Sequence, residues 1–395
     1  MAPVMPIRAT MTGSWYRRPE IAALLVQSTT GELGPEHGKA IENAERLAIR
    51  EQLHPHGAKD GLFAVSNGEQ RKSGYTSFLP NRFDGFSKTQ RAPMQFPETL
   101  IQEFQESNPA LLQALQSQQG GPFLAPAIES KLVYRGEPLA KEEAHQAARL
   151  AKEENAPRVF VPSPSPGVTT IFFPRGGPYR AHRDYVFDLA AELRKEYKAI
   201  LSVDGVDLQI DAPDLAMGRN TAAWGKEYYE LLPQHVDAIN EAVAGLPRDR
   251  IRVHYCYGNY LASHRNDPDF ARVVPEILRL KVGTIVGEAA NPRHEGDALI
   301  VEDYVREHGW PKGLRFAAGV VDVKTPFVET PETVAARLER FGRIEGFDPR
   351  NLLGGTDCGF QTFLGFDNVT HEVALHKLES LAKGAALASK RLGVE

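Results

Sequence analysis

The sequence predicts an α/β fold made of repeated strand-helix units, and three observations support this expectation. From about residue 150 onward, short runs rich in β-branched residues alternate with longer amphipathic stretches. The 395-residue chain is long enough for one large barrel domain. Hydrophobic residues make up 42% of the chain and charged residues 25%, an ordinary balance for a folded globular protein. Because eight strand runs can be counted, we expect a TIM (β/α)8 barrel.

The expected elements follow one another along the whole chain. Strand patterns lie at 7–12, 61–65, 158–161, 206–210, 251–255, 282–286, 314–321 and 351–355. Helical patterns, with apolar residues three and four apart, lie at 185–197, 222–243, 268–280, 331–341 and 370–392. We interpret residues 1–395 as a single barrel domain.

The segment 70–149 interrupts this regular alternation. It is rich in Pro, Gly, Phe and Gln, and predicts a long excursion after the second strand, with a hairpin near 128–139. In a barrel, an excursion at this place leaves from the catalytic face. We therefore expect the segment to cover the active site.

Charge and hydropathy exclude several classes of protein. The net charge is -5, so we expect no nucleic-acid partner. No apolar run approaches the roughly 18 residues that cross a bilayer, and the first residues lack the pattern of a secretory signal. We expect a cytoplasmic protein without a membrane partner. The two cysteines are too few for a disulfide framework, so each needs its own explanation.

Both cysteines follow predicted strands. His254 and Cys256 are two residues apart at a strand end, so their side chains share a face, while Cys358 and Glu288 follow two other strands. Imidazole and thiolate together suit zinc, and the strand ends of one barrel meet at one face. The alternative interpretation is a hydrogen-bonded core histidine with two buried thiols. The pattern leaves both interpretations open.

Six blocks in order resemble one known family. They are Thr12-Gly-Ser14, Gly68-Glu69, Gln209-Ile-Asp211, His254-Tyr-Cys256, Glu288 and Thr356-Asp-Cys-Gly359. In these blocks the sequence resembles the cobalamin-independent methionine synthases, through their C-terminal catalytic barrel. It is also similar to epoxyalkane:coenzyme M transferase of the same superfamily.

The resemblance implies a set of functional residues. It implies a zinc ion bound by His254, Cys256, Glu288 and Cys358, with Glu288 as the ligand that leaves when a substrate sulfur enters. It also implies that three residues bind the thiol substrate, namely Ser14, Glu69 and Asp211. Without the resemblance, a helix N-cap and ordinary surface carboxylates would explain these three residues. Arg17, Arg18, Arg71 and Lys72 flank two of the blocks, where they could bind an anionic group or form a solvated charged face.

The sequence departs from the synthases in two blocks. Asp211 is followed by Ala212, where the synthases carry Glu, and this form is closer to the epoxyalkane transferase. Lys324 stands where the synthases have the histidine that relays a proton to the methyl donor. Asp322, or a Lys324 of lowered pKa, could supply that proton instead. We expect one barrel here, where full-length synthases have two.

These residues predict a zinc-dependent thiol alkyltransferase, and four versions remain open. The first transfers a methyl group from methylfolate to a homocysteine-like thiol, and the second opens an epoxide with a thiol. The third uses a methylcorrinoid protein as the donor. The fourth is a zinc-binding barrel without activity, which the exchangeable Glu288 disfavours. The sequence leaves the oligomeric state open.

Overall fold

Eight parallel strands form the centre of the molecule. The computed structural model describes residues 6–93, 98–110, 112–113, 124–220 and 227–394. The strands are β1 (Arg8–Ala9), β2 (Ala64–Ser66), β5 (Arg158–Pro164), β6 (Val206–Asp211), β7 (Ile251–Tyr255), β8 (Thr284–Glu288), β9 (Arg315–Val321) and β10 (Leu352–Thr356). Their order in the sheet is β1-β10-β9-β8-β7-β6-β5-β2, and a parallel bridge between Thr10 and Ala64 closes the ring. The expected TIM barrel with an excursion after its second strand is confirmed.

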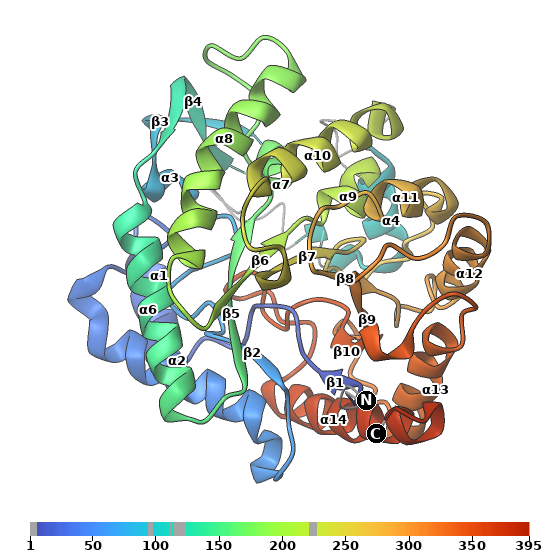
Figure 1. Ribbon diagram of the computed structural model, residues 1–395. Coiled ribbons are helices and arrows are strands. Elements are labelled where there is room, and N and C mark those ends of the chain that lie inside the picture. The colour runs from blue at the N-terminus through green and yellow to red at the C-terminus, as the bar shows by residue number, and fades with distance from the viewer. Residues whose placement is uncertain (1–5, 94–97, 111, 114–123, 221–226, 395) are drawn as a thin grey trace.

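A helix follows each barrel strand and packs on the outside of the ring (Figure 1). These helices are α2 (Gly38–Leu53), α6 (Glu137–Glu153), α8 (His182–Leu201), α10 (Tyr228–Val243), α11 (Phe270–Ile277), α12 (Asp297–His308), α13 (Pro331–Gly342) and α14 (His371–Leu392). Local signals mark the ends of some of these helices. The Thr330 side chain accepts the Thr333 N–H ahead of Pro331, and Gly393 ends α14 with φ 68°. None of the described helices is long and apolar enough to cross a membrane.

Short elements decorate the loops between strands and helices. They are the helices α1 (Pro19–Gln27), α3 (Leu79–Arg82), α4 (Glu98–Ser107), α7 (Pro166–Phe172) and α9 (Asp214–Met217), and the 3-10 turns η1 (Pro35–His37), η2 (Pro55–Gly57), η3 (Gly218–Asn220), η5 (Arg248–Arg250) and η6 (Pro349–Asn351). The predicted helix at 222–243 begins at Tyr228 among the described residues, and its positions 222–226 lie outside them. Helices α2, α6 and α12 were not expected from the sequence.

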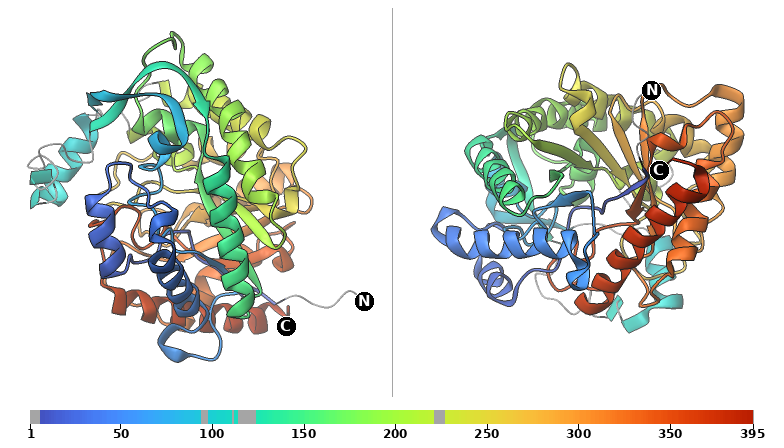
Figure 2. Two further views of the ribbon diagram at one scale, coloured as in Figure 1. Left: turned by 90° about the vertical axis from the view of Figure 1, so that its left-hand side faces the viewer. Right: turned by 60° about the horizontal axis from the view of Figure 1, so that its bottom comes forward.

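The excursion after β2 is more regular than its composition predicts. It contains α3, α4 and an antiparallel ribbon of β3 (Phe83–Pro93) and β4 (Leu124–Tyr134), which curves over one edge of the molecule (Figure 2, left). The expected hairpin at 128–139 is wrong, because residues up to 134 pair with β3 and α6 begins at Glu137. The excursion therefore ends near Gly136 rather than near 149, since α6 is the second barrel helix.

Candidate metal and substrate site

The residues singled out in the sequence gather at the carboxyl ends of the strands. Asp211, Glu288 and His254 lie at or next to the last positions of β6, β8 and β7. Cys256 follows β7 directly, and Cys358 lies two residues after β10. Parallel pairing aligns Asp211 with His254 across neighbouring strands. Because all barrel strands run in one direction, these ends share a single face of the molecule.

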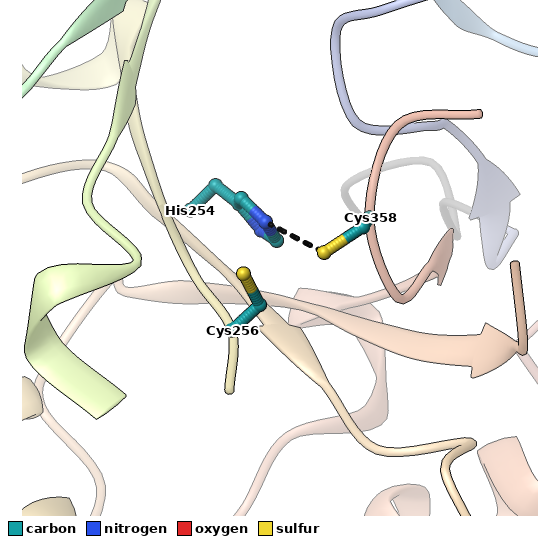
Figure 3. Close-up of side chains that lie close together, drawn as sticks. All are labelled: His254, Cys256 and Cys358. Atoms are coloured by element: carbon teal, nitrogen blue, oxygen red, sulfur yellow. Dashed lines mark hydrogen bonds between the residues drawn. The ribbon is translucent and has the colours of Figure 1, made fainter. Parts of the chain in front are cut away.

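Three of these side chains form a buried group. Ligand atoms of His254, Cys256 and Cys358 all lie within 4.8 Å of one another. The side chains point toward one another from two sides of the barrel, and Cys358 Sγ lies 3.7 Å from His254 Nε2 (Figure 3). The other ring nitrogen, His254 Nδ1, lies 3.2 Å from the carbonyl oxygen of Val286 and can donate to it. That bond would leave Nε2 as the nitrogen that faces the sulfur atoms.

The electrostatics of this group favour a thiolate. A hydrogen bond from Cys358 lowers the pKa of Cys256 to about 6, against the effect of burial, and His254 adds to the lowering. Burial would lower the pKa of His254, but the Cys256 sulfur raises it above its usual value. Burial raises the pKa of Cys358 well above that of an ordinary thiol. One imidazole and two sulfur atoms in this arrangement are donors that fit a zinc ion with a further ligand.

The fourth predicted ligand, Glu288, lies outside this group. Its Oε1 accepts a hydrogen bond of 2.6 Å from Lys324 Nζ, and its Oε2 accepts the backbone N–H of Tyr257 at 2.9 Å. Both charged side chains are buried. Burial alone would raise the pKa of Glu288, but Lys324 and His264 lower it. The structure therefore pairs Glu288 with Lys324 rather than with the sulfur atoms.

Lys324 carries a firmly held proton in this arrangement. Burial would lower its pKa, but Glu288 and Asp357 raise it well above its usual value, which contradicts the expected lowered pKa. Asp322 shapes the loop that carries Lys324, because its oxygens accept the Lys324 N–H at 2.9 Å and the Thr325 hydroxyl at 2.7 Å. The carboxylate of Asp322 is thus occupied by its own loop.

Glu69 lies in a strained turn beside Ser14. Gly68 and Glu69 have φ values of 69° and 55°, and the second value is unusual for a residue with a side chain. A Cβ atom on Gly13 would lie 2.5 Å from Glu69 Oε1 and 2.8 Å from Pro162 Cγ, so a side chain there would displace these groups. Arg17 Nη2 lies 3.6 Å from Glu69 Oε2. Burial raises the pKa of Glu69 to about 7, although Arg17 opposes the shift.

Two polar atoms in this turn lack hydrogen-bond partners among the described residues. They are Ser14 Oγ and Glu69 Oε2, and both are buried. Across the barrel mouth, Gln209 donates a 2.7 Å hydrogen bond to Asp211, and burial raises the pKa of Asp211 to about 6 against the effect of His254. Buried polar atoms without partners are costly unless a ligand or water satisfies them. Ser14 and Glu69 therefore present polar atoms without partners in the described part of the chain at the strand ends, and Asp211 is a further buried carboxylate there.

The basic residues that flank these blocks are engaged with carboxylates. Arg71 and Lys72 are buried and pair with Glu45 at 3.1 Å and Glu143 at 2.9 Å. Arg18 pairs with the partly exposed Glu51. A solvated charged face is thus the wrong interpretation of Arg71 and Lys72, because both are locked into buried ion pairs.

Two residues at the site were missed in the sequence. Asp357 Oδ1 accepts the backbone N–H groups of Ala289 and Ala290, which fixes the loop after Glu288. The position of Asp357 between a predicted strand end and Cys358 could have identified it as a site residue from the sequence. Tyr75, from the excursion, packs on the rings of Phe172 and Phe363, and burial and then Cys256 raise its pKa well above its usual value. No local pattern marks Tyr75.

Helix α4 joins the excursion to the loops of this face. Phe104 packs edge-on against Tyr260, with ring centroids 5.3 Å apart. Glu103 accepts the backbone N–H of Asn266 at 2.8 Å, and Ser107 accepts that of Ser263 at 3.2 Å. These contacts attach the excursion to the loop that follows β7.

Known proteins share this sequence pattern. The family described as "Cobalamin-independent synthase, Catalytic domain" matches residues 166–383. The chain belongs to this family. The expected relation to the methionine synthases is thereby confirmed.

Relatives of the cobalamin-independent synthase family cover nearly the whole chain. The methionine synthase of Saccharolobus solfataricus is 25% identical over 99% of this chain and 96% of its own length. The methionine synthase of Sulfurisphaera tokodaii is 23% identical over 99% of this chain and 94% of its own length. A solved B12-independent methionine synthase from Shewanella sp. W3-18-1, in complex with selenomethionine, has the same fold, with a TM-score of 0.67 and 19% identity over 98% of this chain and 100% of that one.

Proposed function

We propose that this chain is a zinc-dependent enzyme that transfers a methyl or another alkyl group to a small thiol. The observation that carries the proposal is the buried group of His254, Cys256 and Cys358 at the strand ends. Beside it lie buried polar atoms of Ser14 and Glu69 without hydrogen-bond partners among the described residues. Family membership and the methionine synthase relatives point to the same reaction.

The proposed metal ligands are His254, Cys256 and Cys358, with Glu288 as an exchangeable fourth. A bound zinc ion would lower the pKa of a coordinated substrate thiol and leave it as a nucleophilic thiolate. The chain supplies the rest of the environment. Val286 orients the imidazole through its carbonyl, and the buried surroundings of both cysteines exclude water from the sulfur atoms.

Lys324 would be the ion-pair partner of Glu288 when this carboxylate is not bound to the metal. The 2.6 Å contact between Lys324 Nζ and Glu288 Oε1 satisfies the carboxylate away from the sulfur atoms. While a thiol occupied the exchangeable position, Lys324 would hold Glu288 aside through this contact. The same cation would stabilise the charge that develops on the leaving atom of the alkyl donor. In this proposal Asp322 is a positioning residue that holds the Lys324 loop.

The thiol is proposed to carry an ammonium group. Glu69 follows β2 and Asp211 ends β6, with β5 between these two strands, and both buried carboxylates would gain from a cationic partner. Ser14 Oγ, which has no partner in the described part of the chain, would bind the other polar end of the molecule. A homocysteine-like amino acid fits this set of groups.

Epoxide opening by a thiol is the second candidate, and Lys324 favours it. Ring opening leaves an alkoxide, which the Lys324 cation can protonate or stabilise, whereas the methyl donor of the synthases is served by a histidine. We also propose that the excursion covers the site and selects the donor, because α4 and Tyr75 reach the loops around it.

The decisive experiment follows zinc and thiol together. Zinc-loaded protein is mixed separately with homocysteine, coenzyme M and glutathione, while proton release and the zinc coordination shell are recorded. Cys358→Ser should lose zinc and thiol binding together. His376→Ala is the control, because His56, Glu372 and His376 form an exposed group that could also hold a metal. Full zinc and thiol binding by Cys358→Ser would remove Cys358 from the site and contradict the proposal.

A further inference from the structure

The opposite pole of the barrel contains a small charged cavity. It measures about 30 Å³ and lies where β5, β6, β7, β8 and β9 begin, at the far end of these strands from the cysteines. Its charged lining consists of Arg158, Asp207, Asp249, Arg250, Arg252 and Arg315. Four guanidinium groups thus face two carboxylates, an excess of two positive charges.

The carboxylates leave most of this positive charge uncompensated. Arg158 neutralises Asp207, because it donates to both carboxylate oxygens with hydrogen bonds of 2.7 and 2.8 Å. Among the described residues, Arg250, Arg252 and Arg315 form no hydrogen bond or ion pair with a carboxylate. Carbonyl and hydroxyl oxygens hold these three groups in place.

Arg252 is the most confined of the three. It is only 7% exposed, and its guanidinium lies 4.1 Å above the ring of Phe160. It donates to the Thr10 hydroxyl and to the Met11 carbonyl, both at 2.9 Å. Its Nε has no partner in the described part of the chain. A buried cation with an unused donor is costly unless an anion or water meets it.

Arg315, at the rim of the cavity, also lacks a carboxylate partner among the described residues. Its Nη2 donates to the carbonyl of Asp249 at 2.9 Å. Burial, and then repulsion by Arg158, lowers the pKa of Arg315. The positive charges therefore repel one another across the cavity.

We propose that this cavity binds one small tetrahedral oxyanion of the phosphate or sulfate class. Arginine forks match such anions through paired N–H donors. The volume exceeds the roughly 10–15 Å³ that one water molecule needs, and it excludes a large ligand. The site is separate from the proposed thiol site, which lies at the other end of the strands.

Titration calorimetry with inorganic phosphate at constant ionic strength tests the proposal on the full zinc-loaded chain. We expect saturable binding at one site per chain. Arg315→Gln and Arg250→Gln should each weaken it by about tenfold or more, the effect of losing a charge-assisted hydrogen bond. Arg306→Gln on α12 is the matched control, because its side chain is 57% exposed and lies outside the cavity lining.

Titrations with other anions identify which anion binds and whether it is free or part of a larger molecule. Equal binding of glycerol phosphate would show that the phosphate group of a larger molecule is accepted, whereas binding of phosphate and sulfate alone would indicate the free ion. Acetate that binds as tightly as phosphate would overturn the tetrahedral assignment. Phosphate binding that neither variant weakens, or no saturable binding, would overturn the site itself. If the variants do not fold, phosphate should still raise the melting temperature of the natural chain by about 3 °C over chloride, and no rise would overturn the proposal.

Discussion

Lys324 is the residue at which the resemblance to the synthases implies the clearest difference in chemistry. Its contact with Glu288 places a buried cation beside the group that would leave the metal. We predict that Lys324→Ala lowers turnover by about 100-fold or more, as expected for loss of a proton donor or cation, while thiol affinity changes little. Steady-state kinetics and thiol titration measure the two effects separately.

A control and a rescue sharpen this test. Lys312→Ala removes a similar charge from an exposed loop position and should have no effect on turnover. Lys324→His restores the residue type of the synthases, and a gain with methylfolate relative to an epoxide would show that this position selects the donor. An unchanged rate of Lys324→Ala with every donor would reduce Lys324 to a structural partner of Glu288.

Glu69 predicts a pH dependence of substrate binding. Its pKa of about 7 makes it neutral in acid and charged in base, so an ammonium ligand should bind tightly above pH 7. Below that pH, affinity should fall by up to about tenfold per unit. Methionine is the ligand to titrate, because its thioether does not ionise. Asp211, with a pKa of about 6, adds to the fall at lower pH.

The matched variants separate Glu69 from other titrating groups. Glu69→Gln should weaken methionine binding about 10- to 100-fold at pH 8 and flatten the dependence around pH 7. Glu307→Gln changes a highly exposed side chain and should alter neither the methionine affinity nor its pH dependence. A full pH dependence retained in Glu69→Gln would show that another group binds the ammonium.

The clustering of the proposed metal ligands could be predicted from the sequence, but the partners of the surrounding charged groups could not. Two-residue periodicity and strand ends bring His254, Cys256 and Cys358 together, because both follow from backbone geometry alone. The pairing of Glu288 with Lys324 joins β8 to the loop after β9, and depends on side-chain rotamers that no local pattern encodes. The same holds for Tyr75, which reaches the site from the excursion.

At the level of elements, a chain of hydrogen bonds fastens the loops after β7 and β8 to each other. His294 lies 2.8 Å from Asp267 and 3.0 Å from Asp297, and Tyr257 donates to Asp297 at 2.7 Å. Burial would lower the pKa of His294, but the two aspartates raise it to about 9. The imidazolium therefore stabilises the folded state.

This arrangement predicts a loss of stability in alkali. A histidine with a raised folded-state pKa contributes fully below its unfolded pKa near 6.5, and its contribution disappears as the pH rises through about 9. The difference amounts to about 3 kcal/mol. Denaturant unfolding of the natural chain and His294→Gln should converge between pH 7 and 10, whereas exposed His308→Gln should follow the natural chain throughout. If the free energies of unfolding of the natural chain and His294→Gln differed by the same amount at every pH, the raised pKa of His294 would be contradicted.

Helix α4 offers a test of the excursion as a cover. Phe104→Ala removes the packing on Tyr260, and should change the KM for the alkyl donor several-fold while zinc content stays constant. Leu299→Ala, on an exposed side chain of α12, is the control for loss of apolar surface. A drop in zinc content without any change in donor KM would place α4 with the metal site instead.

The barrel elements were more predictable than the excursion. Each barrel strand from 251 onward lies within two residues of its expected bounds, because parallel strands that are buried on both faces form short, mostly apolar runs in the sequence. The ribbon of β3 and β4 has exposed residues along much of both strands, so its alternation is weak. Helix α6 was wrongly included in the irregular segment, although its Ala- and Glu-rich sequence and the proline at its start are typical of a helix.

For the whole molecule, the barrel should remain folded without metal. The main apolar core includes Cys256 and Cys358 but extends through all the barrel strands and helices, far beyond the proposed ligands. Removing zinc should therefore lower the melting temperature by about 5 °C, the effect of losing a ligand present at a thousandfold excess over its Kd. Far-UV circular dichroism of the chelated protein should be unchanged. Loss of that signal would make the metal structural and disfavour an exchangeable site.

The distance along the chain between the proposed metal ligands also bears on the synthesis of the protein. Cys358 follows His254 by 104 residues, and it is brought back to the histidine only when β10 pairs with β9 and β1. A nascent chain that has produced β7 thus offers two ligands and no complete site. Under the proposed zinc binding, metal is captured last, after the ring has closed. The zinc content of a preparation would then report the fraction of chains that were finished and closed, as well as the metal supplied.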